Sequence, residues 1–371
     1  MTRKLAIRWV DLSPLLVLVA AFGCAVVLGG VVMLLTGANP LEAYGALIRG
    51  AVGTPQRVAA SLSRATPFIG ASLAVAFAFR AGLFNIGAEG QLLIGALFGG
   101  WAGTWAWMYG APAIVAIPVV ILMGALGGAL YGGFPGFLKG KTGAHEVIVT
   151  IMLNTIAIRL LEWLVLSRDP VILLDTTASV PHSRDIAEAA RLPLLPGAGS
   201  VSLHWGLVLA VLMCVLMWFV TERTTTGYEI KTVGLNSSAA TYAGMSVPRV
   251  WVLTMATSGA LAGIAGAAEV SGSVGFIQPG VFRNIGFDSI AIALLARGNP
   301  FAIIPAALLW GALLSGAPLM QLQADLSIDL VRIVQALILL FVAADQIVRR
   351  LFRIRGADGE PRAALASGWG G

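Results

Sequence analysis

The chain has 371 residues, of which 58% are hydrophobic and only 11% charged, and its mean hydropathy is +0.87. Soluble domains carry about 25% charged residues, so the composition excludes a soluble enzyme and predicts a surface that mostly faces lipid. The net charge of +6 arises from Lys and Arg scattered between apolar runs, which argues against nucleic-acid binding. We therefore expect an all-α polytopic membrane protein forming one transmembrane domain over residues 1–371.

Apolar runs long enough to span a bilayer, which takes about 20 residues, predict about ten transmembrane helices. The first run exceeds the apolar core of a signal peptide and is expected to be a retained anchor. The second and eighth runs are short, which makes them candidates for tilted or broken helices. The runs lie near residues 13–36, 66–80, 83–108, 112–138, 146–167, 203–221, 250–270, 284–297, 301–318 and 328–348.

The basic residues predict the orientation of these spans. Ten spans with a cytoplasmic N-terminus place about twice as many Lys and Arg inside as outside, as the positive-inside rule requires. Both termini are then cytoplasmic, residues 168–202 form an extracytoplasmic loop, and residues 221–249 and 349–371 form a cytoplasmic loop and a cytoplasmic tail.

Two short patterns occur twice. Ile-Pro-x-x-x-Leu-x-Gly-Ala-Leu spans residues 117–126 and 304–313, and Asn-Ile-Gly stands at residues 85–87 and 284–286. In the predicted topology the two longer copies run in opposite directions, so they predict an inverted internal repeat, a feature typical of transporters. Chance matches between common residues are the alternative.

Polar residues inside the apolar runs are candidates for a solute path, because a buried carboxylate costs at least about 2.5 to 3.5 kcal/mol on insertion scales. Asn85, Glu89 and Gln91 open the third run, and Phe287 and Asp288 lie in the eighth. Hydrogen bonds between helices are the alternative role for the first three.

Charged pairs three residues apart occur on two of the predicted spans. Arg159 and Glu162 lie on the fifth run, and Asp329 and Arg332 lie on the tenth. We expect both to be structural ion pairs.

Residues 135–142 nearly match a phosphate-binding loop, but Pro135 replaces its first Gly and an apolar helix precedes it instead of a strand. The three His and two Cys residues lack metal-ligand spacing, and no constellation of catalytic side chains occurs. We expect no metal, no catalytic residues and no cofactor, and hence no ATP binding by this chain itself.

Four stretches together resemble the permease subunits of ABC importers in the branched-chain amino acid, ribose and nucleoside group, most closely the nucleoside and simple-sugar branch. They read FNIGAEGQLLIGAL (84–97), GAHEVIVTIMLN (143–154), GYEIKTVGLNSSAATYAGM (227–245) and GFDSIAIALLARGNPFAIIPAALLWG (286–311). The long loop at 168–202 resembles that of the longer of two paired permeases.

The resemblance implies a fold like the type II importers in a bacterial inner membrane. It also implies three partners: a cytoplasmic ABC ATPase that binds ATP, a second permease in a heterodimer or homodimer, and an extracytoplasmic solute-binding protein. Asn154 then joins the path candidates, and the inner loop forms coupling helices that dock on the ATPase. The implied coupling residues are Glu229, Lys231, Asn236, Ser237, Ala240, Gly244 and Met245.

The function expected is that of a nucleoside permease. A permease for ribose, another simple sugar or a branched-chain amino acid is the nearest alternative, and an ion-coupled secondary transporter is a more distant one. The sequence supplies no evidence for enzyme activity.

Overall fold

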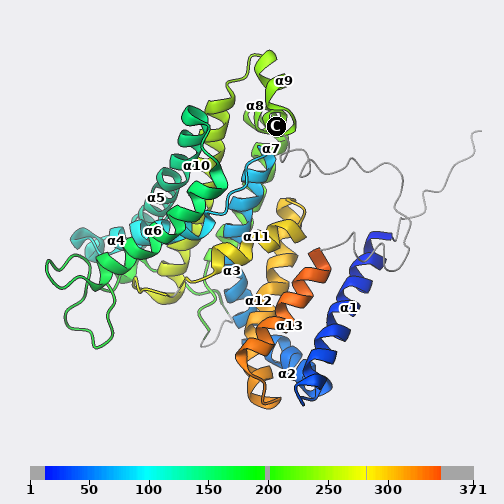
Figure 1. Cartoon of the computed structure of the whole chain (residues 1–371). Helices are drawn as coiled ribbons and strands as arrows, with labels where there is room; N and C mark the ends of the chain where they lie inside the picture. Colours follow the sequence, from blue (N-terminus) through cyan, green and yellow to red (C-terminus); the bar gives the residue numbers. More distant parts are fainter. Residues whose placement is uncertain (1–12, 197–200, 281, 344–371) are drawn as a thin grey trace, which may run out of the picture. The chain divides into compact units, whose positions relative to one another are not determined.

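The computed structural model describes residues 13–196, 201–280 and 282–343. This part of the chain is helical, and its only β-structure is three isolated bridges between residues 168 and 204, which confirms the expected all-α class. The expected cytoplasmic tail at 349–371 lies outside the described residues. The helices in Figure 1 are α1 (Ser13–Leu35), α2 (Pro40–Val52), α3 (Pro55–Arg80), α4 (Ala88–Gly103), η1 (Ala106–Gly110), α5 (Ala113–Thr142), α6 (Glu146–Leu166), η2 (Glu188–Ala190), α7 (Gly206–Arg223), α8 (Thr225–Leu235), α9 (Ser237–Tyr242), α10 (Val247–Glu269), η3 (Val270–Val274), α11 (Ile285–Leu295), α12 (Pro300–Gln323) and α13 (Ile328–Ala343).

The helices form two compact units. In one, α1 packs against α13, and the Tyr44 hydroxyl of α2 donates a hydrogen bond to the Val26 carbonyl of α1 at 2.8 Å. The other runs from Ala51 to Gly316 and contains every site discussed below.

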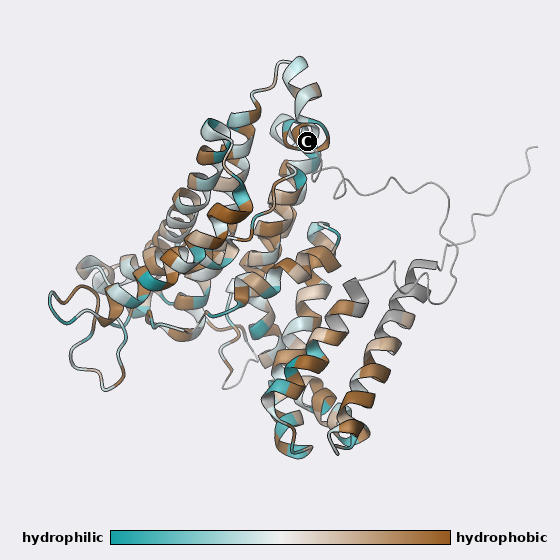
Figure 2. Ribbon diagram, viewed as in Figure 1, coloured by the Kyte–Doolittle hydropathy of each residue, from teal (hydrophilic) through white to brown (hydrophobic). Residues whose placement is uncertain are grey.

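Six helices of the described chain are long and apolar enough to cross a bilayer: α3, α5, α6, α7, α10 with η3, and α12. Figure 2 shows brown, hydrophobic residues along the spanning helices, whereas α9 is pale to teal. The protein is thus a multi-pass membrane protein, and the expected total of ten crossings stays a prediction.

The second span was predicted at 66–80, which is shorter than the helix α3 that contains it. Helix α3 begins at Pro55, because the Thr54 side chain caps its N-terminus and proline is favoured in the first turn. Its first turns contain polar side chains that hydrogen-bond to backbone carbonyls: the Ser61 hydroxyl donates to the Ala51 carbonyl at 2.7 Å and the Thr66 hydroxyl to the Leu62 carbonyl at 3.0 Å. Hydropathy alone therefore missed the first eleven residues of a full-length helix.

Two other elements differ from the expected ones. The third span, predicted at 83–108, is broken into α4 and the short η1 helix, and the amphipathic helix α2 was not predicted. The eighth span is the 11-residue α11, which is as short as expected.

The core of the larger unit is a close contact between α5 and α10, and α10 also packs against α3 and α4. Gly124 and Gly128 of α5 lie against Gly259 and Gly263 of α10. A Cβ atom on Gly128 would lie 2.1 Å from the Gly259 carbonyl oxygen, and one on Gly263 would lie 2.2 Å from the Gly124 oxygen. The two backbones touch, a contact that only glycine allows and that membrane helices commonly use.

The segment between α6 and α7 is attached mainly through main-chain groups. The amides of Ser183, Ile186 and Leu192 donate hydrogen bonds of 2.9 Å to the carbonyls of Ile277, Gly275 and Ser271 respectively. The segment is therefore paired with the stretch that leads from α10 toward α11.

His204, just before α7, is fully buried, and its Nε2 lies 3.2 Å from the Ser273 hydroxyl and 3.9 Å from Glu269 Oε2.

Both copies of the ten-residue pattern occupy the same position in their helices. Ile117 lies four residues after Ala113, the first residue of α5, and Ile304 lies four residues after Pro300, the first residue of α12. This register is what an internal repeat predicts.

Replacing Gly128 with Ala should destabilise the protein by about 1 to 3 kcal/mol, because the added methyl group forces α5 and α10 apart. The matched control is Gly133→Ala on the next turn of α5, where the nearest atom to a new Cβ is the Ala256 Cβ at 3.4 Å. Thermal unfolding midpoints in detergent should fall for Gly128→Ala and hold for Gly133→Ala. Equal midpoints for the two variants would contradict the importance of this contact.

Candidate functional site

The first Asn-Ile-Gly motif forms a buried polar cluster in the connection between α3 and α4. The Asn85 amide nitrogen donates to Gln91 Oε1 and to the Ser258 hydroxyl, both at 2.8 Å, and the Asn85 side-chain oxygen accepts from the Gly87 amide at 2.9 Å. Asn85 is fully buried and Gln91 is 1% exposed. Their hydrogen bonds connect α4 to α10.

Glu89 connects this cluster to the second Asn-Ile-Gly motif. Its two carboxylate oxygens accept hydrogen bonds from the backbone amides of Asn284 at 2.7 Å and Gly286 at 2.6 Å. These amides lie at the N-terminus of α11, where a negative charge is favourable. Glu89 is 2% exposed, and a Cβ on Gly286 would lie 2.1 Å from the Glu89 amide nitrogen. The second motif therefore touches the backbone of Glu89, two residues after the first motif, and the Glu89 carboxylate caps α11.

Asn154 attaches α6 to the same turn. Its side-chain oxygen accepts from the Gly90 amide at 2.8 Å, and its amide nitrogen donates to the Ile86 carbonyl at 2.9 Å. The side chain is 3% exposed. Four of the six expected path residues, namely Asn85, Glu89, Gln91 and Asn154, are thus brought together as a buried network whose hydrogen bonds go to protein groups.

The other two expected path residues are more accessible. Phe287 is 43% exposed, and Asp288 is partly buried in the first turn of α11. The Trp310 indole N–H lies near Asp288 but outside hydrogen-bond geometry.

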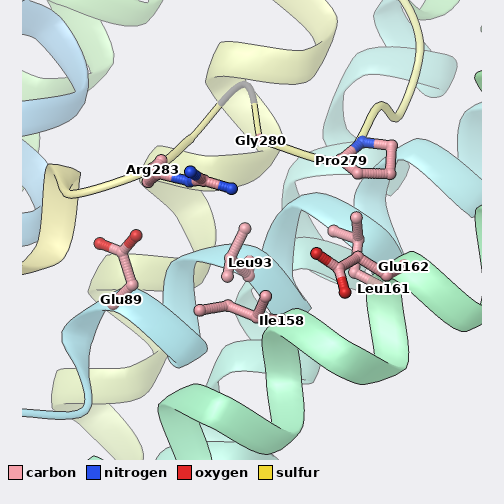
Figure 3. A pocket seen from close by; sticks show the side chains of 8 residues that line it. All are labelled: Glu89, Leu93, Ile158, Leu161, Glu162, Pro279, Gly280 and Arg283. Carbon is pink, nitrogen blue, oxygen red and sulfur yellow. The ribbon is translucent and has the colours of Figure 1, made fainter.

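A small hollow of about 30 Å³ opens beside Glu89, between α4, α6 and the loop before α11. In Figure 3 Arg283 reaches over it opposite Leu93 and Ile158, and Glu162 faces it from α6. Glu162 and Arg283 were not among the expected site residues. The lining residues are Glu89, Leu93, Ile158, Leu161, Glu162, Pro279, Gly280 and Arg283.

The pairing of Arg159 with Glu162 was predicted, but its place in the fold was not. Arg159 Nη1 and Glu162 Oε2 are 2.8 Å apart, while 76% of the Arg159 side chain and 28% of the Glu162 side chain are exposed. The three-residue spacing indicates an ion pair on a helix, but it does not show which face of the helix carries it.

The segment between α7 and α10 forms the two helices α8 and α9. The Asn236 side chain caps α9 by accepting from the Ala239 amide at 2.9 Å, Ala240 is buried, and Gly244 has a φ of +83°. Lys231 contacts Glu222, which also binds Arg80 at 2.8 Å, so α8 is linked to α7 and α3. These residues shape the segment.

The accessible surface of this segment includes residues that sequence reasoning missed. Tyr228, Leu235 and Tyr242 are 65%, 71% and 95% exposed. In the sequence, the available signal was the presence of three large side chains within an otherwise polar loop. Of the expected coupling residues, Glu229 and Ser237 are exposed and Met245 is half-buried.

A multi-pass helical protein whose helices are joined by buried polar side chains is typical of membrane transport subunits. The family model described as "Branched-chain amino acid transport system / permease component" matches residues 57–343. The chain therefore belongs to this permease family and is a transport subunit, not an enzyme.

Curated relatives are similar over nearly their whole length. The guanosine ABC transporter permease protein NupP of Bacillus subtilis is 39% identical, covering 91% of this chain and 95% of its own. The nucleoside ABC transporter permease protein NupB of Lactococcus lactis is 35% identical, over 91% of this chain and 92% of its own. The glucose ABC transporter permease protein TsgB13 of Haloferax volcanii is 35% identical, over 91% of this chain and 88% of its own. No solved structure matches the chain significantly.

Glu89→Gln should reduce stability by about 1 to 3 kcal/mol, because the glutamine NH₂ group would face a buried backbone amide that then lacks an acceptor. We expect a lower thermal midpoint and less folded protein, with uptake per folded molecule largely retained. The exposed Glu188→Gln is the control. An unchanged midpoint together with reduced uptake per folded molecule would instead make Glu89 a solute contact.

Proposed function

We propose that the chain is the permease subunit of an ABC importer for nucleosides. The observation that carries this proposal is the 39% identity to the guanosine permease over almost the full length of both chains, together with a second nucleoside permease at 35%. The relative named for glucose, also at 35%, keeps a sugar as the second candidate solute. A branched-chain amino acid has only the family description in its favour.

The site residues divide into two groups in this proposal. Asn85, Glu89, Gln91 and Asn154 hold α4, α6, α10 and α11 in place and so shape the path, while Phe287 and Asp288 are the expected residues accessible enough to contact solute. Aromatic and carboxylate groups suit a nucleoside, which offers a base for stacking and hydroxyls that donate hydrogen bonds.

The wild-type chain, assembled with its ATPase, second permease and binding protein in vesicles, should take up radiolabelled guanosine or uridine when ATP is supplied. Excess unlabelled nucleoside should compete, and glucose at the same concentration should not. Vesicles without ATP are the control, because an ion-coupled transporter would keep its uptake. Competition by glucose alone would make the protein a sugar permease.

The partner proteins follow from the same proposal. Residues 221–249 would face the cytoplasm and dock on an ABC ATPase through α8 and α9, with both termini on that side and residues 168–202 outside. Support comes from the exposed Tyr242 on the short capped helix α9, since aromatic anchors dominate many interfaces. The relatives NupB and NupC of one organism, and NupP and NupQ of another, support a second permease subunit.

Tyr242→Ala should weaken binding of the ATPase to the permease at least about tenfold, because it removes an exposed aromatic anchor. Titration of the purified ATPase against the permease in nanodiscs measures this. Trp107→Ala, an exposed aromatic residue in η1, is the matched control and should bind like wild type. Unchanged affinity in Tyr242→Ala would exclude α9 from the docking surface.

A further inference from the structure

The exposed face of α6 carries charge at membrane depth. Arg159 is 76% exposed and lies seven residues before the end of the helix at Leu166. Its Nη1 is held 2.8 Å from Glu162 Oε2, and Glu162 is itself four residues inside that end. At 1.5 Å per residue these separations along the helix are about 10 Å and about 6 Å. The guanidinium group therefore stays inside the span and does not reach the helix end.

The large exposed side chains that accompany Arg159 are apolar. They recur with Arg159 at intervals of three or four residues, which places them together on one face of the helix. We call this face the α6 stripe. It consists of Ile148, Met152, Ile156, Arg159, Trp163 and Leu166.

Two other spanning helices show what a lipid-facing surface of this protein looks like. No charged residue occurs between residues 114 and 137 of α5 or between residues 207 and 220 of α7. Their exposed large side chains at these depths are all apolar, such as Leu126 and Leu130 of α5 and Leu216 of α7. The α6 stripe differs from both because it exposes a guanidinium group in the middle of the span.

Lipid is a poor environment for that group, since intramembrane charges usually face protein or water. The α6 stripe suits water badly, because its residues other than Arg159 are apolar. The hollow on the other side of Glu162 has about 30 Å³, which is room for a water molecule or two and not for a hydrated channel. A second protein chain is the cover that fits both the apolar residues and the charge.

The ion pair determines the chemistry of that cover. Glu162 balances the charge of Arg159, so the partner needs no net charge at this depth. Within the described part of the chain, Arg159 donates through Nη1 alone, which leaves the donors on Nη2 and Nε for an oxygen acceptor of the partner.

We propose that the α6 stripe is the surface on which the second permease subunit packs, with an oxygen acceptor of that subunit opposite Arg159. An apolar helix surface interrupted by one polar contact is a typical contact between membrane helices, and arginine is often a dominant residue of interfaces. The surface deepens the proposed function and rests on it, because that proposal supplies the second permease.

Photo-cross-linking provides the first test. The transporter assembled in nanodiscs from this chain, its second permease, ATPase and binding protein carries p-benzoylphenylalanine in place of Ile156, one turn before Arg159. Mass spectrometry should identify the second permease as the cross-linked partner, in at least fivefold higher yield than from the same residue in place of Leu126, an exposed position on α5. Products with lipid, with another segment of this chain or with a second copy of it would each overturn the proposal. Absence of any product at Ile156, while Leu126 reacts with lipid, would mean that water covers the stripe and would also overturn it.

Removal of both charges provides the second test. If the stripe faced lipid, Arg159→Leu combined with Glu162→Leu would leave assembly unchanged or strengthen it. If the second permease packs here, its acceptor loses a donor, and the affinity between the two permeases should fall at least about tenfold, as measured by fluorescence titration in detergent. The thermal midpoint of the chain alone separates lost pairing from lost folding.

The matched control removes another exposed ion pair. Arg191 Nη2 and Asp185 Oδ2 are 3.6 Å apart in the segment between α6 and α7, and Arg191→Leu combined with Asp185→Leu should pair like wild type. Equal affinity in the Arg159→Leu, Glu162→Leu variant and wild type would overturn the α6 stripe as the interface and leave the proposed function standing. Failure of the wild-type chain to bind a second permease at all would instead overturn the pairing in the proposed function.

Discussion

Backbone contact between α5 and α10 is the constraint on which the larger unit depends. Lipid supplies no hydrophobic force between helices, so association must come from close packing and polar contacts. Glycines four residues apart let the two helices touch through main-chain atoms, and α4 packs against both. The polar turn before α4 can form its hydrogen bonds with Ser258 of α10 only because that contact holds the helices in register.

Polar side chains in this core accept backbone hydrogen bonds that water would accept in a soluble protein. The start of α11 would leave backbone amides unpaired in a medium without solvent, and Glu89 supplies acceptors for two of them. A carboxylate at this depth is stable because its charge is shared by backbone donors at a helix N-terminus. Glu89 thus supplies the acceptors that the start of α11 needs, and these backbone donors in turn stabilise the buried carboxylate.

Sequence alone predicted the fold class and most spans, because long apolar runs follow directly from bilayer thickness. It misplaced the start of α3, since Ser61 is polar by type but satisfied by a local carbonyl. It identified Glu89 as unusual and expected the two Asn-Ile-Gly motifs to be related, yet hydrogen-bond partners almost two hundred residues apart leave no local signal. Arg283 was missed because it lies in a loop, and only the fold brings it to the hollow beside Glu162.

The attachment of the segment between α6 and α7 has a consequence for variation among homologues. Amides and carbonyls, which every residue but proline offers in full, hold residues 183–192 against residues 271–277. The exposed side chains of Arg184 and Glu188 form none of these hydrogen bonds. Substitutions there would change the chemistry of the exposed surface while the course of the main chain persists, whereas insertions would shift the pairing register. Conserved length with divergent side chains is the pattern that this attachment permits.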